Sequence, residues 1–270
     1  MGTPFPGPTI SFVAPAARPD GTKVVLKISL PDRETIHESD ALRLLDGDGS
    51  VRLLAADPAR CALLLERLEP GTALSEMVDE DQANRIASDL LRRFWRPLPP
   101  GHLFDRAADR AAEWAQSVVP EFLALGKPFE ASLAEEAAVL FTELSVSCEP
   151  SVLLHQDFHH GNVLSARREP WLIIDPKPLA GERAFDAGAL LRDRRHALAA
   201  ASDAARIMAR RLDLLADLLA LDRTRIRDWG LAQAVELGLW SYKVGDIEEG
   251  NRLIGTARLL QPESRTGVKR

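Results

Sequence analysis

The spacing of apolar residues changes near residue 70, and this change limits the fold more than any other feature of the sequence. Before it, residues 23–30 alternate with the period of a β-strand, with Lys27 in the middle of the run. After it, apolar residues recur at helical spacing, as in residues 133–144. We therefore predict an α+β protein with a small β-rich lobe over residues 1–68 and a larger, mainly helical lobe over residues 69–270.

The β-rich lobe is expected to hold its elements in the order β-β-α-β-β. A turn signal at residues 19–21 (P-D-G) separates a short apolar run at residues 10–14 from the strand at residues 23–30, which predicts a hairpin. The remaining elements expected here are a helix over residues 34–45 and strands over residues 51–54 and 61–65.

Composition narrows the choice of partner and compartment. The net charge is −6, which argues against a nucleic-acid partner and favours a cationic small molecule. The two cysteines indicate neither a disulfide framework nor a zinc site. No apolar run approaches the roughly 20 residues that span a bilayer, and the start lacks the features of a signal peptide. We expect a cytoplasmic protein without a membrane partner, and the oligomeric state stays open.

The strongest chemical signal is the segment H-Q-D-F-H-H-G-N at residues 155–162, followed by I-I-D-P at residues 173–176. Asp157 and Asn162 lie five positions apart in a loop after a predicted strand, and Asp175 ends the next predicted strand. Each residue alone is more often a cap or a turn residue. Together they match phosphoryl transfer, in which one carboxylate orients and deprotonates a hydroxyl while oxygen ligands hold Mg²⁺ on nucleotide phosphates.

Lys27 and Glu38 form a second polar pair within apolar patterns. A lone lysine in a strand is usually exposed, but Glu38 shares a helical stripe with Leu42 and Leu45. An unpaired carboxylate would be costly to bury there, so we predict an ion pair with Lys27. Such a pair aims an ammonium at the α- and β-phosphates of a nucleotide. Glu34, one turn earlier, is the alternative partner.

These segments resemble the aminoglycoside phosphotransferase family, which has a protein-kinase-like fold. The resemblance is greatest to the branch of streptomycin 6-phosphotransferase and hydroxyurea phosphotransferase, and it covers roughly residues 10–255. The matching segments are V-L-K at 25–27, E-S-D-A-L-R-L-L at 38–45, L-L-L-E-R-L at 63–68, H-Q-D-F-H-H-G-N at 155–162, L-I-I-D-P at 172–176 and G-E-R-A-F-D-A-G-A-L-L at 181–191.

The resemblance implies an ATP-dependent small-molecule kinase. It makes Asp157 the catalytic base, and Asn162 and Asp175 the Mg²⁺ ligands. Lys27 would bind the phosphates of ATP, and Glu38 would hold Lys27 in place.

The resemblance also assigns the nucleobase site and two supports. Residues 66–68, from Glu66 to Leu68, would form the hinge that contacts adenine, and Val25 would line the adenine pocket. His155 and Asp186 would be structural supports of the catalytic loop.

The start of the chain departs from the family pattern. The phosphate loop of the family lies between its first two strands, and the corresponding residues here, 5–11, contain no G-x-G-x-x-G. The first strand is expected to be absent. A nucleotide-binding pseudoenzyme is therefore one alternative.

The acceptor is expected to be a cationic molecule with a hydroxyl group, because carboxylates and aromatic faces suit guanidinium and amine groups. The resemblance favours streptomycin, and an amino sugar such as glucosamine is the alternative. A different class, a metal-dependent hydrolase using His155, Asp157 and His159, would also fit the loop. The candidate acceptor-binding residues are Glu182, Asp193, Glu236 and Trp240.

Overall fold

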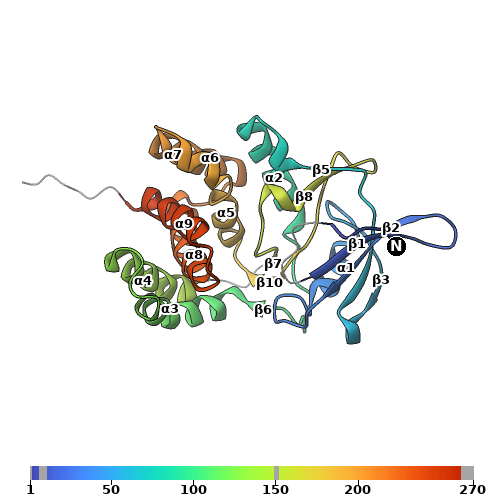
Figure 1. Ribbon diagram of the computed structural model, residues 1–270, viewed down its shortest axis with the longest axis horizontal. Helices are drawn as coiled ribbons and strands as arrows, with labels where there is room; N and C mark the ends of the chain where they lie inside the picture. Colours follow the sequence, from blue (N-terminus) through green and yellow to red (C-terminus); the bar gives the residue numbers. More distant parts are fainter. Residues whose placement is uncertain (1, 6–10, 149–151, 263–270) are drawn as a thin grey trace, which may run out of the picture. The chain divides into compact units, whose positions relative to one another are not determined.

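The computed structural model describes residues 2–5, 11–148 and 152–262, which fold into two compact units (Figure 1). The first unit combines residues 1–106 with residues 150–182, and the second combines residues 107–149 with residues 183–270. The α+β class is confirmed, with a β-sheet in the N-terminal region and helices in the C-terminal region. The units group the segment after residue 150 with the N-terminal sheet, and the lobe boundary at residue 68 stays a prediction.

A four-stranded antiparallel sheet, in the order β1-β2-β4-β3, forms the N-terminal part of the first unit. Strand β2 is central, since Lys27 pairs with Val13 of β1 on one side and with Leu63 of β4 on the other. The face of β2 that carries Lys27 and Ser29 is buried, whereas Ile28 is exposed. The strands of this sheet are β1 (Ser11–Ala17), β2 (Lys23–Ser29), β3 (Leu53–Asp57) and β4 (Ala62–Glu66).

Helix α1 (Glu38–Leu45) connects β2 to β3. It was predicted from residue 34, but residues 34–37 form turns, because Asp32 accepts backbone hydrogen bonds at its carbonyl from Thr35 and Ile36. The helix ends at Asp46, which adopts a left-handed conformation with φ of 48°. Its predicted stripe is confirmed: Glu38 is buried on the same face as Leu42 and Leu45.

Residues 2–5 run antiparallel to β1, along its open edge. The backbone N–H of Gly2 donates to the carbonyl of Pro15 at 2.7 Å, and that of Phe5 donates to the carbonyl of Val13 at 2.8 Å. The first strand was expected to be absent; residues 2–5 form no regular strand, but they bond to the edge of β1 where such a strand would pair. The expected phosphate loop has its ends at Phe5 and Ser11, and its residues 6–10 lie outside the described residues.

Two smaller sheets position residues 155–177 in the first unit. Their strand orders are β5-β8-β9 and β6-β10-β7. Strand β9 is tied to the residues before β3, because Val51 donates to the carbonyl of Ile173 and Ile173 donates to the carbonyl of Gly49. The elements not yet given are β5 (Pro70–Ala73), α2 (Glu80–Phe94), β6 (Asp105–Arg106), β7 (Val152–Leu154), β8 (Val163–Ala166), β9 (Trp171–Ile173), β10 (Leu179–Gly181) and the 3₁₀ turns η1 (Pro58–Arg60), η2 (Leu74–Glu76) and η3 (His160–Asn162).

The second unit is a set of helices around α8. Helix α8 packs against α4, α5 and α9 (Figure 1). Its Trp229 is fully buried. A Cβ atom added to Gly188 of α5 would lie 2.8 Å from the backbone nitrogen of Gly230 in α8, so these two helices touch through their backbones. The helices are α3 (Ala107–Ala124), α4 (Ala131–Ser147), α5 (Ala184–Leu191), α6 (Arg195–Ala200), α7 (Ala204–Leu219), α8 (Arg223–Lys243) and α9 (Ile247–Leu260).

The length and the apolar character of the helices bear on membrane insertion. Within residues 2–5, 11–148 and 152–262, none is both long enough and apolar enough to cross a bilayer.

The core of the second unit gives a stability prediction. The Phe141 ring on α4 is fully buried and lies 5.2 Å from the Trp114 ring, centroid to centroid. Phe141→Ala should lower the free energy of unfolding by about 3–5 kcal/mol, because it leaves a cavity. Val146→Ala on the same helix is the control; that side chain is exposed, so its effect should stay within about 0.5 kcal/mol. Urea unfolding followed by circular dichroism measures both, and equal effects would contradict this packing.

Candidate active site

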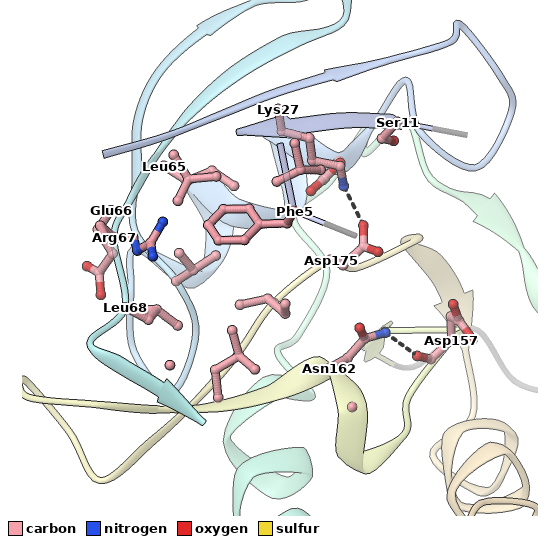
Figure 2. Close-up of a pocket in the computed structure, with 18 of the residues that line it drawn as sticks. Phe5, Ser11, Lys27, Leu65, Glu66, Arg67, Leu68, Asp157, Asn162 and Asp175 are labelled. Atoms are coloured by element: carbon pink, nitrogen blue, oxygen red, sulfur yellow. Dashed lines mark hydrogen bonds and ion pairs between the residues drawn. The ribbon is translucent and has the colours of Figure 1, made fainter. Parts of the chain in front are cut away.

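A cavity of about 610 Å³ opens within the first unit. Its walls come from the N-terminal sheet, from α1, from the segment after β4, and from residues 157–164 and 174–177. Figure 2 shows Lys27, Asp175, Asn162 and Asp157 along one side of this cavity, and residues 66–68 along another. The fold thus brings residues that are up to 172 positions apart in the sequence, from Phe5 to Lys177, into one site.

Lys27 holds the position predicted for it, buried on the central strand and facing the cavity. Its Nζ lies 2.6 Å from Oε2 of Glu38 and also forms an ion pair with Asp175. Burial acts to lower the pKa of Lys27, but the two carboxylates outweigh it and raise that pKa, so the ammonium stays charged. Glu34, the alternative partner, instead accepts a hydrogen bond from the side chain of Gln156 at 2.9 Å.

The loop of residues 155–162 is held by hydrogen bonds to Ile174, the residue that follows β9. His155 is completely buried, and its Nε2 donates to the carbonyl oxygen of Ile174 at 3.0 Å. The backbone nitrogen of Ile174 in turn donates to the carbonyl of Asn162 at 2.9 Å. These contacts agree with the supporting role expected for His155. The other expected support, Asp186, is a buried residue of α5 in the second unit, and its role stays a prediction.

Two residues of the site have left-handed backbone conformations, which are uncommon for residues other than glycine. Gln156, immediately before Asp157, has φ of 69°, and Asp175 has φ of 59°. Strain of this kind persists only where the surrounding structure fixes the backbone. The bonds to Ile174 provide that constraint at both positions.

The oxygen atoms of Asn162 and Asp175 fit a magnesium site. The side-chain nitrogen of Asn162 donates to the carbonyl oxygen of Asp157 at 2.9 Å (Figure 2), so the amide oxygen is left to act as a ligand. The Asp175 carboxylate also lines the cavity. Mg²⁺ prefers such oxygen ligands, and in nucleotide sites it takes one or two of them from the protein and others from phosphate groups.

The alternative of a metal-dependent hydrolase does not have its ligands in place. Burial lowers the pKa of His155 to about 4, and its Nε2 is engaged with Ile174. His159 uses its Nδ1 to accept a hydrogen bond from the backbone of Gly161. Among the residues that the structure describes, no three or more His, Cys, Asp or Glu side chains are arranged to hold a metal ion.

Lys177 is a site residue that the sequence reasoning missed. Its Nζ lies 2.9 Å from Oδ2 of Asp157 and 3.7 Å from Oε2 of Glu34. Burial acts to raise the pKa of Asp157, but the Lys177 ammonium opposes it, and the net result is a pKa below the ordinary value. Asp157 is therefore an ionised carboxylate. Lys177 follows Asp175 by two positions, but the left-handed backbone at Asp175 breaks the strand alternation, so the spacing in the sequence provided no signal that the two side chains share one cavity.

The predicted nucleobase residues also line the cavity. Val25, Glu66 and Leu68 are part of its wall, together with Arg67 and Phe5. The guanidinium carbon of Arg67 lies 4.6 Å from the centre of the Phe5 ring. Contact of these residues with adenine stays a prediction.

The four candidate acceptor residues divide between the two units. Glu182 follows β10 in the first unit, whereas Asp193, Glu236 and Trp240 belong to the second. Trp240 is half exposed on α8, and Glu236 is half-buried one turn before it. Their acceptor roles also stay predictions.

Comparison with known proteins identifies the family of the chain. Residues 4–245 match the family described as aminoglycoside/hydroxyurea antibiotic resistance kinase. Streptomycin 6-kinase of Streptomyces glaucescens is 38% identical over 95% of this chain and 81% of its own length. Hydroxyurea phosphotransferase of Kitasatospora aureofaciens is 38% identical over 93% of this chain and 71% of its own length.

Solved structures share the fold at low sequence identity. A ternary complex of a thermostable mutant of aminoglycoside phosphotransferase APH(4)-Ia with ADP and hygromycin B aligns with a TM-score of 0.67 and 15% identity, covering 96% of this chain and 92% of that chain. Choline kinase LicA from Streptococcus pneumoniae aligns with a TM-score of 0.65 and 14% identity, covering 94% and 91%. The fold is therefore that of the protein-kinase-like small-molecule kinases, and the chain belongs to the aminoglycoside/hydroxyurea antibiotic resistance kinase family.

Proposed function

We propose that this enzyme transfers the γ-phosphoryl group of ATP to a hydroxyl group of streptomycin, at the 6-position, with Mg²⁺ bound at Asn162 and Asp175. The observation that carries the proposal is the gathering of Asp157, Asn162, Asp175 and Lys27 around one cavity. The 38% identity to a streptomycin 6-kinase over 95% of the chain supports the choice of acceptor. The net charge of −6 suits a guanidinium-bearing antibiotic.

Lys27 and the metal ligands organise the nucleotide. Mg²⁺ would neutralise charge on the phosphate groups of ATP. Lys27 is held by Glu38 and contacts Asp175, so its ammonium lies next to the metal ligand that would face the phosphates. Complexes of structural neighbours with ADP or AMP-PNP support the use of ATP. Because ATP is a cytoplasmic cosubstrate, the proposal places the enzyme in the cytoplasm.

Asp157 acts on the acceptor. As an ionised carboxylate it can accept a hydrogen bond from the attacking hydroxyl group and orient its oxygen. A carboxylate with a lowered pKa is a weak base, so it takes the proton only when the new bond to phosphorus is forming. This timing agrees with the loose transition state of phosphoryl transfer, in which positioning and charge dominate.

The direct test is an ADP-release assay with ATP and streptomycin, hydroxyurea or glucosamine in separate reactions. Streptomycin should give the highest kcat/KM, and its product should gain one phosphoryl group, located at the 6-hydroxyl by NMR. A higher kcat/KM with hydroxyurea or glucosamine would contradict the assignment of streptomycin as the acceptor. Binding of ATP without transfer to any acceptor would identify a pseudoenzyme.

Asp157→Asn tests the base. Without a carboxylate to accept the proton, kcat should fall by about 10²–10⁴-fold. ATP binding, measured by calorimetry, should change little, because Asp157 is assigned to the acceptor. The control is Asp20→Asn, which changes an exposed turn of the first unit. An equal loss of ATP binding in Asp157→Asn would make Asp157 a structural residue.

Lys27→Ala tests the phosphate ligand. It should weaken ATP use by at least about tenfold, since a charged contact to the phosphates is lost and Glu38 is left without its partner. Lys23→Ala is the matched control on the same strand, because the Lys23 side chain is exposed and pairs with Glu69. If kcat and the KM for ATP are unchanged in Lys27→Ala, Lys27 does not belong to the site.

A further inference from the structure

Lys177 reaches the catalytic base from a segment that the fold holds firmly. The backbone nitrogen of Lys177 donates to the carbonyl of His155 at 3.0 Å, and this bond fixes the chain two residues after Asp175. The Lys177 side chain is mostly buried, lines the cavity, and places Nζ 2.9 Å from Oδ2 of Asp157. Its position is therefore set by the same hydrogen bonds that shape the catalytic loop.

A second carboxylate restrains the ammonium from another side. Oε2 of Glu34 lies 3.7 Å from Nζ of Lys177, and Oε1 of the same carboxylate accepts the hydrogen bond from Gln156 at 2.9 Å. Gln156 is the residue before Asp157, so Glu34 contacts both the loop and the lysine. An ammonium has three N–H donors, and Asp157 takes one of them.

The distribution of charge explains why a cation is needed here. Lys27 is shared between Glu38 and Asp175, so its charge is already balanced by two carboxylates. A phosphoryl group that moves toward a hydroxyl at Asp157 approaches a third carboxylate of like charge. Lys177 is the ammonium that the described residues place against that carboxylate. It can offset the repulsion at the point where charge builds up during transfer.

We propose that Lys177 is a further catalytic residue, which donates a hydrogen bond to a non-bridging oxygen of the transferred phosphoryl group while it remains paired with Asp157. The inference rests on the proposed phosphotransfer. In the step, the acceptor oxygen forms a bond to the γ-phosphorus. The bond from this phosphorus to the β,γ-bridging oxygen breaks, and its electron pair leaves on ADP. The hydroxyl proton goes to Asp157, and Lys177 keeps its protons.

The test uses Lys177→Met, which keeps the length of the side chain without its charge, and Lys177→Arg, which keeps the charge. Lys177→Met should lower kcat on the order of 10²-fold with little change in the KM for ATP, because the contact forms only during transfer. Lys177→Arg should recover part of the loss. Lys23→Met is the control, since Lys23 is an exposed lysine outside the cavity.

A second measurement distinguishes contact with the phosphoryl group from support of Asp157. Aluminium fluoride mimics the transferred phosphoryl group next to Mg-ADP, and calorimetry can compare the affinity of Mg-ADP with and without it. The wild type should bind more tightly with aluminium fluoride, and Lys177→Met should lose this gain while still binding Mg-ADP. A gain retained in Lys177→Met, an unchanged kcat, or an equal loss of Mg-ADP affinity would each overturn the proposal.

This titration needs no acceptor, so it separates the inference from the proposed function. If the wild type fails to phosphorylate streptomycin but Lys177→Met still loses the aluminium fluoride gain, the acceptor is wrong and the role of Lys177 stands. If streptomycin is phosphorylated equally fast by the wild type and Lys177→Met, the function stands and the role of Lys177 is wrong.

Discussion

The buried ammonium of Lys27 joins three segments that are distant in sequence: the central strand β2, helix α1 through Glu38, and the end of β9 through Asp175. A buried ion pair adds little net stability, but removing one partner costs about 3–5 kcal/mol because it leaves an unpaired charge. The ion pairs of Lys27 therefore fix how these three segments are arranged, and they add little to the free energy of unfolding. Asp175, Lys27 and helix α1 thus take their positions from one another.

The rest of the site also places ammonium groups next to carboxylates. Asp157 is matched by Lys177, and Lys177 also lies near Glu34. Asp175 and Asp157 are thus each paired with an ammonium. The backbone around them is held in left-handed conformations at Gln156 and Asp175 by bonds between the loop and β9. A site that is ordered before its substrates arrive spends less free energy on reorganisation during the reaction.

The spacing of apolar and polar residues along the sequence predicted those features of the site that depend on a single strand or helix. The alternation in β2 and the stripe of α1 identified Lys27 and Glu38, because a polar residue in an apolar pattern requires a partner. Lys177 was missed because its contact with Asp157 depends on how the chain continues after Pro176. The contact of residues 2–5 with the edge of β1 was missed because it consists of two backbone hydrogen bonds, which do not depend on the identity of the side chains.

The most direct test of the account is a crystal structure with Mg²⁺, a non-hydrolysable ATP analogue and streptomycin. It should show the metal bound by Asn162 and Asp175, a phosphate group at Lys27, and the 6-hydroxyl of streptomycin against the carboxylate of Asp157. A nucleotide bound away from these residues, or an acceptor hydroxyl out of reach of Asp157, would contradict the central claim that this cavity is where phosphoryl transfer occurs.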